Sequence, residues 1–253
     1  MALDAQQLHS ELDTLLNPGA FRDYCPNGLQ VEGTRAIKKL ITGVTASQAL
    51  IKAAIENEAD ALLVHHGYFW RGEDPAIVGL KRARVNLLLE NNVALFAYHL
   101  PLDAHPDLGN NAQLAKLLDF KVVDQTGPPG ETPLVWLGET HNALSATALA
   151  EHLQSKLGRE PVWVSGGDRE VNKVAWCTGA AQNFFEIAVA SGADAYITGE
   201  ISEPSAHVAR EAGVHFYAAG HHATERYGVQ AVGSHLADKF GIEHEFIDID
   251  NPA

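Results

Sequence analysis

The chain has 253 residues, of which 46% are hydrophobic and 20% charged, values typical of a globular protein with one large or two ordinary domains. Its 18 basic and 32 acidic residues give a formal net charge of −14. This balance argues against strong non-specific binding to nucleic acid, which needs a basic surface. Two cysteines are too few for a disulfide framework, and no apolar run suits a signal peptide or a membrane span. We therefore expect a cytoplasmic protein with no membrane contact.

The first half of the sequence alternates between predicted helices and short buried strands. An amphipathic N-terminal helix ends at Pro18 and Gly19, a pair that stops helices. After it we predict strands at 39–45, 61–66, 93–98 and 121–124, and helices at 47–58, 77–91 and 108–118. Short, uniformly apolar strands separated by helices are typical of a parallel sheet covered on both faces.

The sequence then repeats this pattern after a stretch rich in glycine and proline at 125–133 (QTGPPGETP). Residues 39–66 align without a gap with residues 173–200, and seven of the 28 positions are identical. Two generic βαβ units could converge on such weak identity, but the gapless register favours duplication. We predict an α/β fold of two related lobes with mainly parallel buried strands. The first lobe would comprise residues 1–125 plus 221–253, and the second residues 126–220.

Side chains that can bind metal ions stand at the ends of three predicted strands, those at 61–66, 93–98 and, in the second half, 214–219. They are His65 and His66 at the end of the first, His99, Asp103 and His105 after the second, and His221, His222 and Glu225 after the third. In open α/β sheets, ligands bind at the carboxyl ends of the strands. Each motif alone is compatible with ordinary polar loop residues. Together, imidazoles and carboxylates suit Zn²⁺, Mn²⁺ or Fe²⁺.

The positions of these residues within each motif predict which of them act together. Neighbouring residues of an extended strand point in opposite directions, so His65 and His66 could serve two different ions. If a helix begins near His222, then His221 and Glu225 lie four residues apart on it and converge. Glu200 matches His66 in the repeat, and it is the leading candidate for a carboxylate that faces the site without binding metal.

The loop after the first histidine pair reads Tyr68–Phe69–Trp70–Arg71. Its aromatic rings and its cation suit the stacking of a base and the binding of a phosphate. A hydrophobic loop packed on the protein, or on a neighbouring subunit, explains the same residues at least as well.

The motifs HHGYFW, HLPLDAHPDLGNN, TGE and GHHATE, with the earlier NGLQVEG, resemble the dinuclear-metal family of GTP cyclohydrolase I type 2 homologues over essentially the whole chain. The resemblance implies a toroidal homohexamer with two divalent metal ions (Zn, Mn or Fe) in each subunit. Carried over to this sequence, the metal ligands would be His65, His66, Asp103, His221 and Glu225. His99 would lie just outside these ligands or serve as an occasional ligand. Many members have proline after the histidine pair, where this chain has glycine at 67. The resemblance therefore does not predict the shape of that loop.

We expect a metal-dependent hydrolase that acts on a small nucleotide-like or heterocyclic substrate. Five protein ligands for two ions leave open coordination positions, as catalytic sites require. Ions held in this way activate a water molecule and polarise the bond under attack. His99, whose ordinary pKa is about 6.5, is the expected general acid or base. The alternative is a non-enzymatic metal-binding hexamer that stores metal or binds a protein partner.

Overall fold

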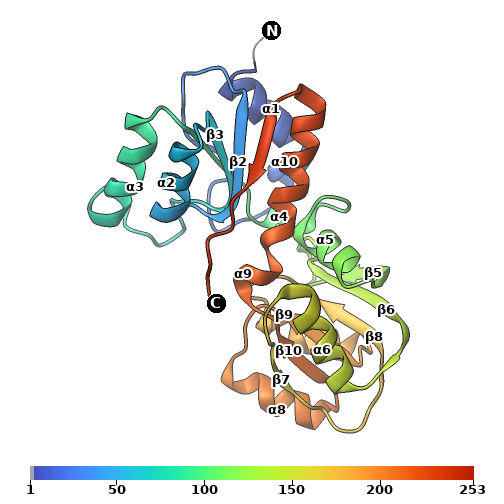
Figure 1. Ribbon diagram of the computed structural model, residues 1–253. Helices are drawn as coiled ribbons and strands as arrows, with labels where there is room; N and C mark the ends of the chain where they lie inside the picture. The colour runs from blue at the N-terminus through green and yellow to red at the C-terminus, as the bar shows by residue number, and fades with distance from the viewer. Residues whose placement is uncertain (1–2) are drawn as a thin grey trace. The chain divides into compact units, whose positions relative to one another are not determined.

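The computed structural model describes residues 3–253, which divide into two compact units (Figure 1). Unit 1 comprises the chain up to Gly109 together with Gly228–Asp250, and unit 2 comprises Asn110–Tyr227 together with Asn251–Ala253. Among the described residues, no helix is both long and apolar enough to cross a membrane.

Unit 1 is built on a five-stranded sheet with the order β1-β4-β3-β2-β11. The four strands from β4 to β11 run parallel to one another, and β1 pairs antiparallel with β4. The strands are β1 (Gly28–Val31), β2 (Lys39–Thr45), β3 (Ala61–His66), β4 (Ala94–Ala97) and β11 (Glu243–Phe246). The helices are α1 (Ala5–Leu16), α2 (Gln48–Glu56), α3 (Gly79–Glu90), α4 (Leu100–Ala104) and α10 (Arg226–Phe240), with a short 3₁₀ helix η1 (Pro18–Ala20).

Helices cover both faces of this sheet (Figure 1). α1 and α10 pack on one face, and α2 and α3 pack on the other. On α1, Leu8, Leu12 and Leu16 recur every four residues and are buried, and each contributes roughly 2 kcal/mol through burial. The helix begins at a capping box between Asp4 and Gln7. The uniformly apolar strands follow from this double coverage, because neither face of the sheet meets water.

Unit 2 is built on a six-stranded sheet with the order β5-β6-β8-β9-β10-β7. Its three strands β8, β9 and β10 are parallel, and the remaining pairs are antiparallel. The strands are β5 (Lys121–Thr126), β6 (Val135–Leu144), β7 (Val162–Val164), β8 (Val171–Trp176), β9 (Ala195–Thr198) and β10 (His215–Ala218). The helices are α5 (Asn110–Leu117), α6 (Ala146–Leu157), α7 (Phe185–Ala190), α8 (Glu203–Ala212) and α9 (His221–Thr224), with a 3₁₀ helix η2 (Gln182–Phe184).

Two hydrophobic clusters fill the space on either side of this second sheet. α5 and α6 contribute to the cluster that contains Trp136 and Trp176, and α7 and α8 contribute to the cluster that contains Tyr196 and Phe216. The predicted α/β fold of two related lobes is confirmed. The second sheet has antiparallel strands on both sides of its parallel core. The sequence pattern did not distinguish these strands from parallel ones.

The register of the two sheets follows the internal repeat residue by residue. Leu40 pairs with Ala61 between β2 and β3, and Val174 pairs with Ala195 between β8 and β9, so both partners differ by 134 positions. Asp60 and Asp194, also 134 positions apart, each accept hydrogen bonds through Oδ2 from two successive backbone N–H groups at the start of the preceding strand. A shared backbone register and a shared carboxylate contact are difficult to explain by convergence, and they support duplication.

The stretch at 125–133 lies at the turn of a hairpin, because β5 pairs antiparallel with β6. The compact units divide after Gly109 and again after Tyr227. The predicted lobe boundaries were the composition break at 125–133 and the position before His221. The two sets of positions differ because α5 and β5 pack into unit 2, where α5 joins the core cluster beside Trp176.

Candidate metal centre

His65 is the last but one residue of β3, and its side chain is completely buried. Its Nδ1 lies 3.0 Å from the carbonyl oxygen of Tyr98. A carbonyl only accepts hydrogen bonds, so Nδ1 donates, and Nε2 of the neutral ring then presents a lone pair. This Nε2 lies 3.5 Å from Oδ1 of Asp103, which α4 positions and which is only 6% exposed. Two electron-rich atoms at this distance favour a cation beside them.

His66 and His99 complete a group of three imidazoles with His65. The ring centroids of His65 and His66 are 4.5 Å apart, and those of His65 and His99 are 5.0 Å apart. Each of the three offers a ring nitrogen within 4.8 Å of the others. The predicted alternation along the strand does not keep the two rings apart, although both residues belong to β3. Nδ1 of His66 lies 3.1 Å from the hydroxyl of Thr45.

Asp23 fixes the position of His99, although no sequence pattern singled it out. Nδ1 of His99 donates to Oδ1 of Asp23 over 2.7 Å, and the Asp23 side chain is only 4% exposed. Burial raises the pKa of Asp23, but hydrogen bonding and charge from His99, with further donors from Asn27 and Tyr24, lower it to about 2. Asp23 is therefore ionised near neutral pH. It reaches His99 because β1 runs antiparallel to β4, with Gly28 opposite Ala97.

Unit 2 contributes a second pair of predicted ligands on the short helix α9 and the residue after it. Nε2 of His221 lies 3.2 Å from Oε2 of Glu225, whose side chain is 3% exposed. Nδ1 of His221 donates to Oε1 of Glu200 over 2.7 Å. Burial lowers the pKa of His221, but hydrogen bonds and charge from Glu225 and Glu200 raise it to about 9. Glu200 thus contacts the ring nitrogen that faces away from Glu225.

Gly179 makes room for the Glu225 carboxylate. A Cβ atom at position 179 would lie 2.1 Å from Oε1 of Glu225, and the residue has a φ of +71°. Both the contact and the left-handed backbone require glycine here. The sequence offered only a weak sign of this role, a glycine just after β8 at the position that matches Thr45 in the repeat.

The residues present fit a divalent transition metal. Each of the four histidines His65, His66, His99 and His221 has its Nδ1 next to an oxygen of the protein, respectively from Tyr98, Thr45, Asp23 and Glu200. An outer hydrogen bond of this kind orients a metal-binding imidazole and selects Nε2 as the ligand atom. Buried carboxylates of Asp103 and Glu225 lie beside two of these rings. Imidazole nitrogens with carboxylate oxygens are the donor set that Zn²⁺, Mn²⁺ and Fe²⁺ share.

Two other candidate histidines do not join these groups. Nδ1 of His105 accepts hydrogen bonds from the backbone N–H groups of Asp107 and Leu108, so the side chain caps a turn. His222 belongs to none of the metal-ligand groups found among residues 3–253. The structure thus assembles His65, His66, His99 and Asp103 in unit 1, and His221 and Glu225 in unit 2.

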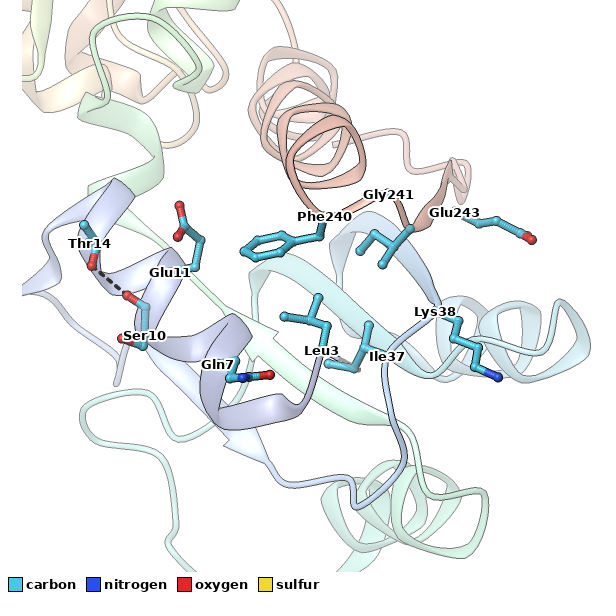
Figure 2. A pocket seen from close by; sticks show the side chains of 11 residues that line it. Leu3, Gln7, Ser10, Glu11, Thr14, Ile37, Lys38, Phe240, Gly241 and Glu243 are labelled. Atoms are coloured by element: carbon cyan, nitrogen blue, oxygen red, sulfur yellow. Dashed lines mark hydrogen bonds between the residues drawn. The ribbon is translucent and has the colours of Figure 1, made fainter. Parts of the chain in front are cut away.

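A surface cavity of about 730 Å³ in unit 1 lies between α1 and the end of α10 (Figure 2). Leu3, Ile37 and Phe240 contribute its apolar wall, and Lys38 and Glu243 lie on its rim. Its lining contains no histidine or cysteine, and it shares no residue with the imidazole group. We therefore assign the chemistry to the imidazole group and not to this larger space.

The chain is similar to known proteins over its full length. It is 51% identical over 253 residues, all of both chains, to a Pseudomonas aeruginosa protein named GTP cyclohydrolase 1 type 2 homolog. A solved structure of the protein ybgI, described as of unknown function, has 50% identity and a TM-score of 0.95, with 99% of this chain and 100% of that chain covered. A crystal structure of a protein from Thermus thermophilus has 34% identity and a TM-score of 0.88, with the same coverage of both chains. The model of the Duf34/NIF3 (NGG1p interacting factor 3) family matches residues 3–252, and the chain belongs to that family.

Proposed function

We propose that the protein is a hydrolase that depends on two divalent metal ions held by His65, His66, Asp103, His221 and Glu225. The observation that carries this proposal is the set of one buried and two partly buried imidazoles whose Nδ1 atoms all have oxygen partners, beside two buried carboxylates. Such an arrangement is organised for metal binding before any ion arrives. The name of the relatives, homologues of GTP cyclohydrolase 1 type 2, favours a small nucleotide-like or heterocyclic substrate.

The ions, when bound, would supply an activated water molecule and polarise the bond under attack. The chain's own residues then orient the reactants and move protons. His99 would transfer a proton through Nε2, because Asp23 holds its Nδ1 proton in a short hydrogen bond. The carboxylate also stabilises the imidazolium that forms when His99 takes up a proton.

Metal content and activity measured on the same samples test this function. Elemental analysis of protein reloaded with Zn²⁺, Mn²⁺ or Fe²⁺ should find about two ions per subunit, and fewer than one ion would contradict the assigned site. The loaded protein should hydrolyse at least one member of a panel of nucleotides, cyclic amides and phosphoesters. The His65→Ala variant is the control that should lose both metal and hydrolysis.

We further propose that the protein assembles into a homohexamer and acts in the cytoplasm. Exposed apolar side chains gather at the start of α3, where Ile77, Val78 and Leu80 are each about half to three-quarters exposed. Apolar patches of this kind are typical of surfaces that bind another protein. Light scattering at micromolar concentration should give the mass of six chains, and a monomer would contradict this part of the proposal.

A non-enzymatic role in metal storage or partner binding predicts a different response to chelation. A structural metal site contributes directly to the stability of the fold, so removal of the ions would unfold the protein. A catalytic site should leave the circular dichroism spectrum unchanged after treatment with EDTA, because each unit has its own hydrophobic core. Unfolding on chelation, without hydrolysis by the loaded protein, would favour the non-enzymatic role.

A further inference from the structure

Two aromatic side chains stand beside His99 at the edge of the imidazole group. The indole ring of Trp70 lies 4.9 Å from the His99 ring, centroid to centroid, at an interplanar angle of 81°. The phenol ring of Tyr24 lies 6.4 Å from the same ring at 64°. Tyr24 is 57% exposed, although it is a large aromatic residue beside the imidazole group of unit 1. An exposed aromatic ring at such a place offers a flat surface to a ligand.

The backbone holds Tyr24 firmly despite this exposure. Its N–H donates to Oδ1 of Asp23, and its carbonyl accepts a hydrogen bond from the backbone N–H of Arg71 over 2.6 Å. The guanidinium of Arg71 donates through Nη2 to the carbonyl of Asp23 over 2.9 Å. These bonds join the segment before β1 to the loop after β3. A backbone segment that is already fixed loses little conformational entropy when a ligand binds beside it.

Arg71 adds a positive charge to this surface. Its guanidinium carbon lies 5.7 Å from the centroid of the Tyr24 ring, and the residue is exposed. Within residues 3–253 no carboxylate forms an ion pair with it, whereas Lys81 in the following helix pairs with Glu73 over 2.8 Å. The planar N–H groups of arginine match the oxygens of a phosphate or a carboxylate. In a chain of net charge −14, this cation is well placed to select an anionic ligand.

The other two aromatic residues of the loop have structural roles. Tyr68 is buried and its hydroxyl donates to the carbonyl of Ala46 over 2.6 Å. Phe69 packs against the core cluster beneath α2 and α3, and Lys81 lies 5.6 Å from its ring. The backbone of Phe69 has a φ of 66°, a left-handed conformation that turns the chain between the two pairs. The loop therefore has Tyr68 buried in the core and Phe69 packed against it, Trp70 partly exposed with its indole N–H donating to the Gly67 carbonyl, and Arg71 exposed.

We propose that Tyr24, Trp70 and Arg71 form a binding subsite for a planar aromatic ring that carries an anionic group. The ring would stack on Tyr24, with Trp70 beside it, and the phosphate or carboxylate of the ligand would bind the Arg71 guanidinium. The edge of the ligand ring opposite Arg71 would then lie next to His99. The inference rests on the proposed function for the chemistry at that edge, but binding to the subsite uses residues of unit 1 alone.

Binding to the EDTA-treated protein tests the subsite without any contribution from metal. We would titrate it with AMP, phenyl phosphate, adenosine and ribose 5-phosphate, using calorimetry and tryptophan fluorescence. Trp70 is the only tryptophan of unit 1, so the Trp70→Phe variant identifies the part of the signal that comes from this surface. AMP and phenyl phosphate should bind at least tenfold more tightly than ribose 5-phosphate or adenosine, because only they combine a ring with an anion.

Three substitutions separate the ring from the charge. Arg71→Gln should weaken AMP binding about tenfold and change adenosine binding less than twofold. Tyr24→Leu should weaken both about tenfold, through lost stacking, whereas Tyr24→Phe should bind both as the wild type does. Arg82→Gln, at an exposed arginine of α3, is the matched charge control and should leave every affinity unchanged. Thermal unfolding of each variant verifies that the fold is intact.

Each outcome decides for or against the subsite. Equal affinity for AMP and ribose 5-phosphate, or an Arg71→Gln variant that binds AMP like the wild type, would overturn it. So would the absence of binding by both AMP and phenyl phosphate. If a metal-loaded protein hydrolyses a substrate while the planar anions do not bind, the proposed function stands and the subsite fails. If the planar anions bind as described and no metal is taken up, the subsite stands and the proposed function fails.

Discussion

Replacing Asp23 by asparagine should destabilise unit 1 by about 2–3 kcal/mol at neutral pH. The carboxylate accepts four hydrogen bonds: Oδ1 accepts from Nδ1 of His99 and from the Tyr24 N–H, and Oδ2 accepts from Nδ2 of Asn27 and from the Leu100 N–H. An amide keeps only one oxygen, so two of the four donors lose their acceptor in either orientation. At roughly 1.5 kcal/mol for each hydrogen bond to a charged group, the loss is about 3 kcal/mol.

The pKa of Asp23 leads to a similar magnitude and predicts how it depends on pH. The pKa falls from 3.8 to about 2, and each unit corresponds to about 1.4 kcal/mol, which makes roughly 2.5 kcal/mol. Because the folded-state pKa lies below the unfolded value, this stabilisation is present above about pH 4. It is lost as the pH falls through about 2. Asparagine does not titrate, so the difference between wild type and Asp23→Asn should shrink on acidification.

Urea unfolding at pH 7, 4 and 2.5, followed by circular dichroism and tryptophan fluorescence, measures this difference. Asp119→Asn is the matched control, because Asp119 also pairs with a histidine, His141, over 3.3 Å, but both side chains are more than half exposed. Its effect should stay below about 0.5 kcal/mol. A difference for Asp23→Asn below that value at pH 7, or one that does not change between pH 7 and 2.5, would refute the reasoning.

Three further predictions concern metal binding and proton transfer. Asp103→Ala and Glu225→Ala each remove a buried carboxylate, so the metal content and the rate of hydrolysis should fall together. Elemental analysis measures the metal content, and a normal content in either variant would exclude that residue as a ligand. His99→Ala should keep its metal while the turnover rate falls roughly 10²–10⁴-fold, the usual contribution of a positioned proton-transfer group; loss of metal would make His99 a ligand instead. Burial lowers the pKa of His221, but Glu225 and Glu200 raise it to about 9. The ring is therefore protonated near pH 7.5. Zinc binding at that pH should therefore release about one proton from it. Calorimetry in two buffers measures this number, which should be smaller for Glu200→Gln.

Local patterns in the sequence predicted the elements that hold the candidate site. The strand at 39–45 has the bounds of β2, and the strand predicted at 61–66 has those of β3, because short apolar runs between helices mark buried strands clearly. The gapless alignment of 39–66 with 173–200 reappears as the identical register of β2 with β3 and of β8 with β9. The repeat in the sequence and the repeat in the strand register coincide, so the sequence alone was enough to infer the duplication.

Contacts between residues far apart in the sequence depended on the order of the strands. Asp23 and His99 are 76 positions apart and meet only because β1 lies antiparallel beside β4, an arrangement that no local pattern encodes. The stretch at 125–133 has the composition of a linker, but it is a hairpin turn because β5 finds its partner in β6. Composition identifies a break in regular structure, and strand pairing decides what the break connects.

The division of the loop 68–71 shows the same limit at the scale of single side chains. The sequence did not show which of the three aromatic residues and the arginine point inward, whereas in the structure the left-handed backbone at Phe69 sends Tyr68 to the Ala46 carbonyl and leaves Arg71 on the surface beside Tyr24. Residue type therefore determined that rings and a cation were available near the histidines. Only the tertiary structure decided which of them pack inward and which face a ligand, because burial depends on neighbours that come from distant parts of the chain.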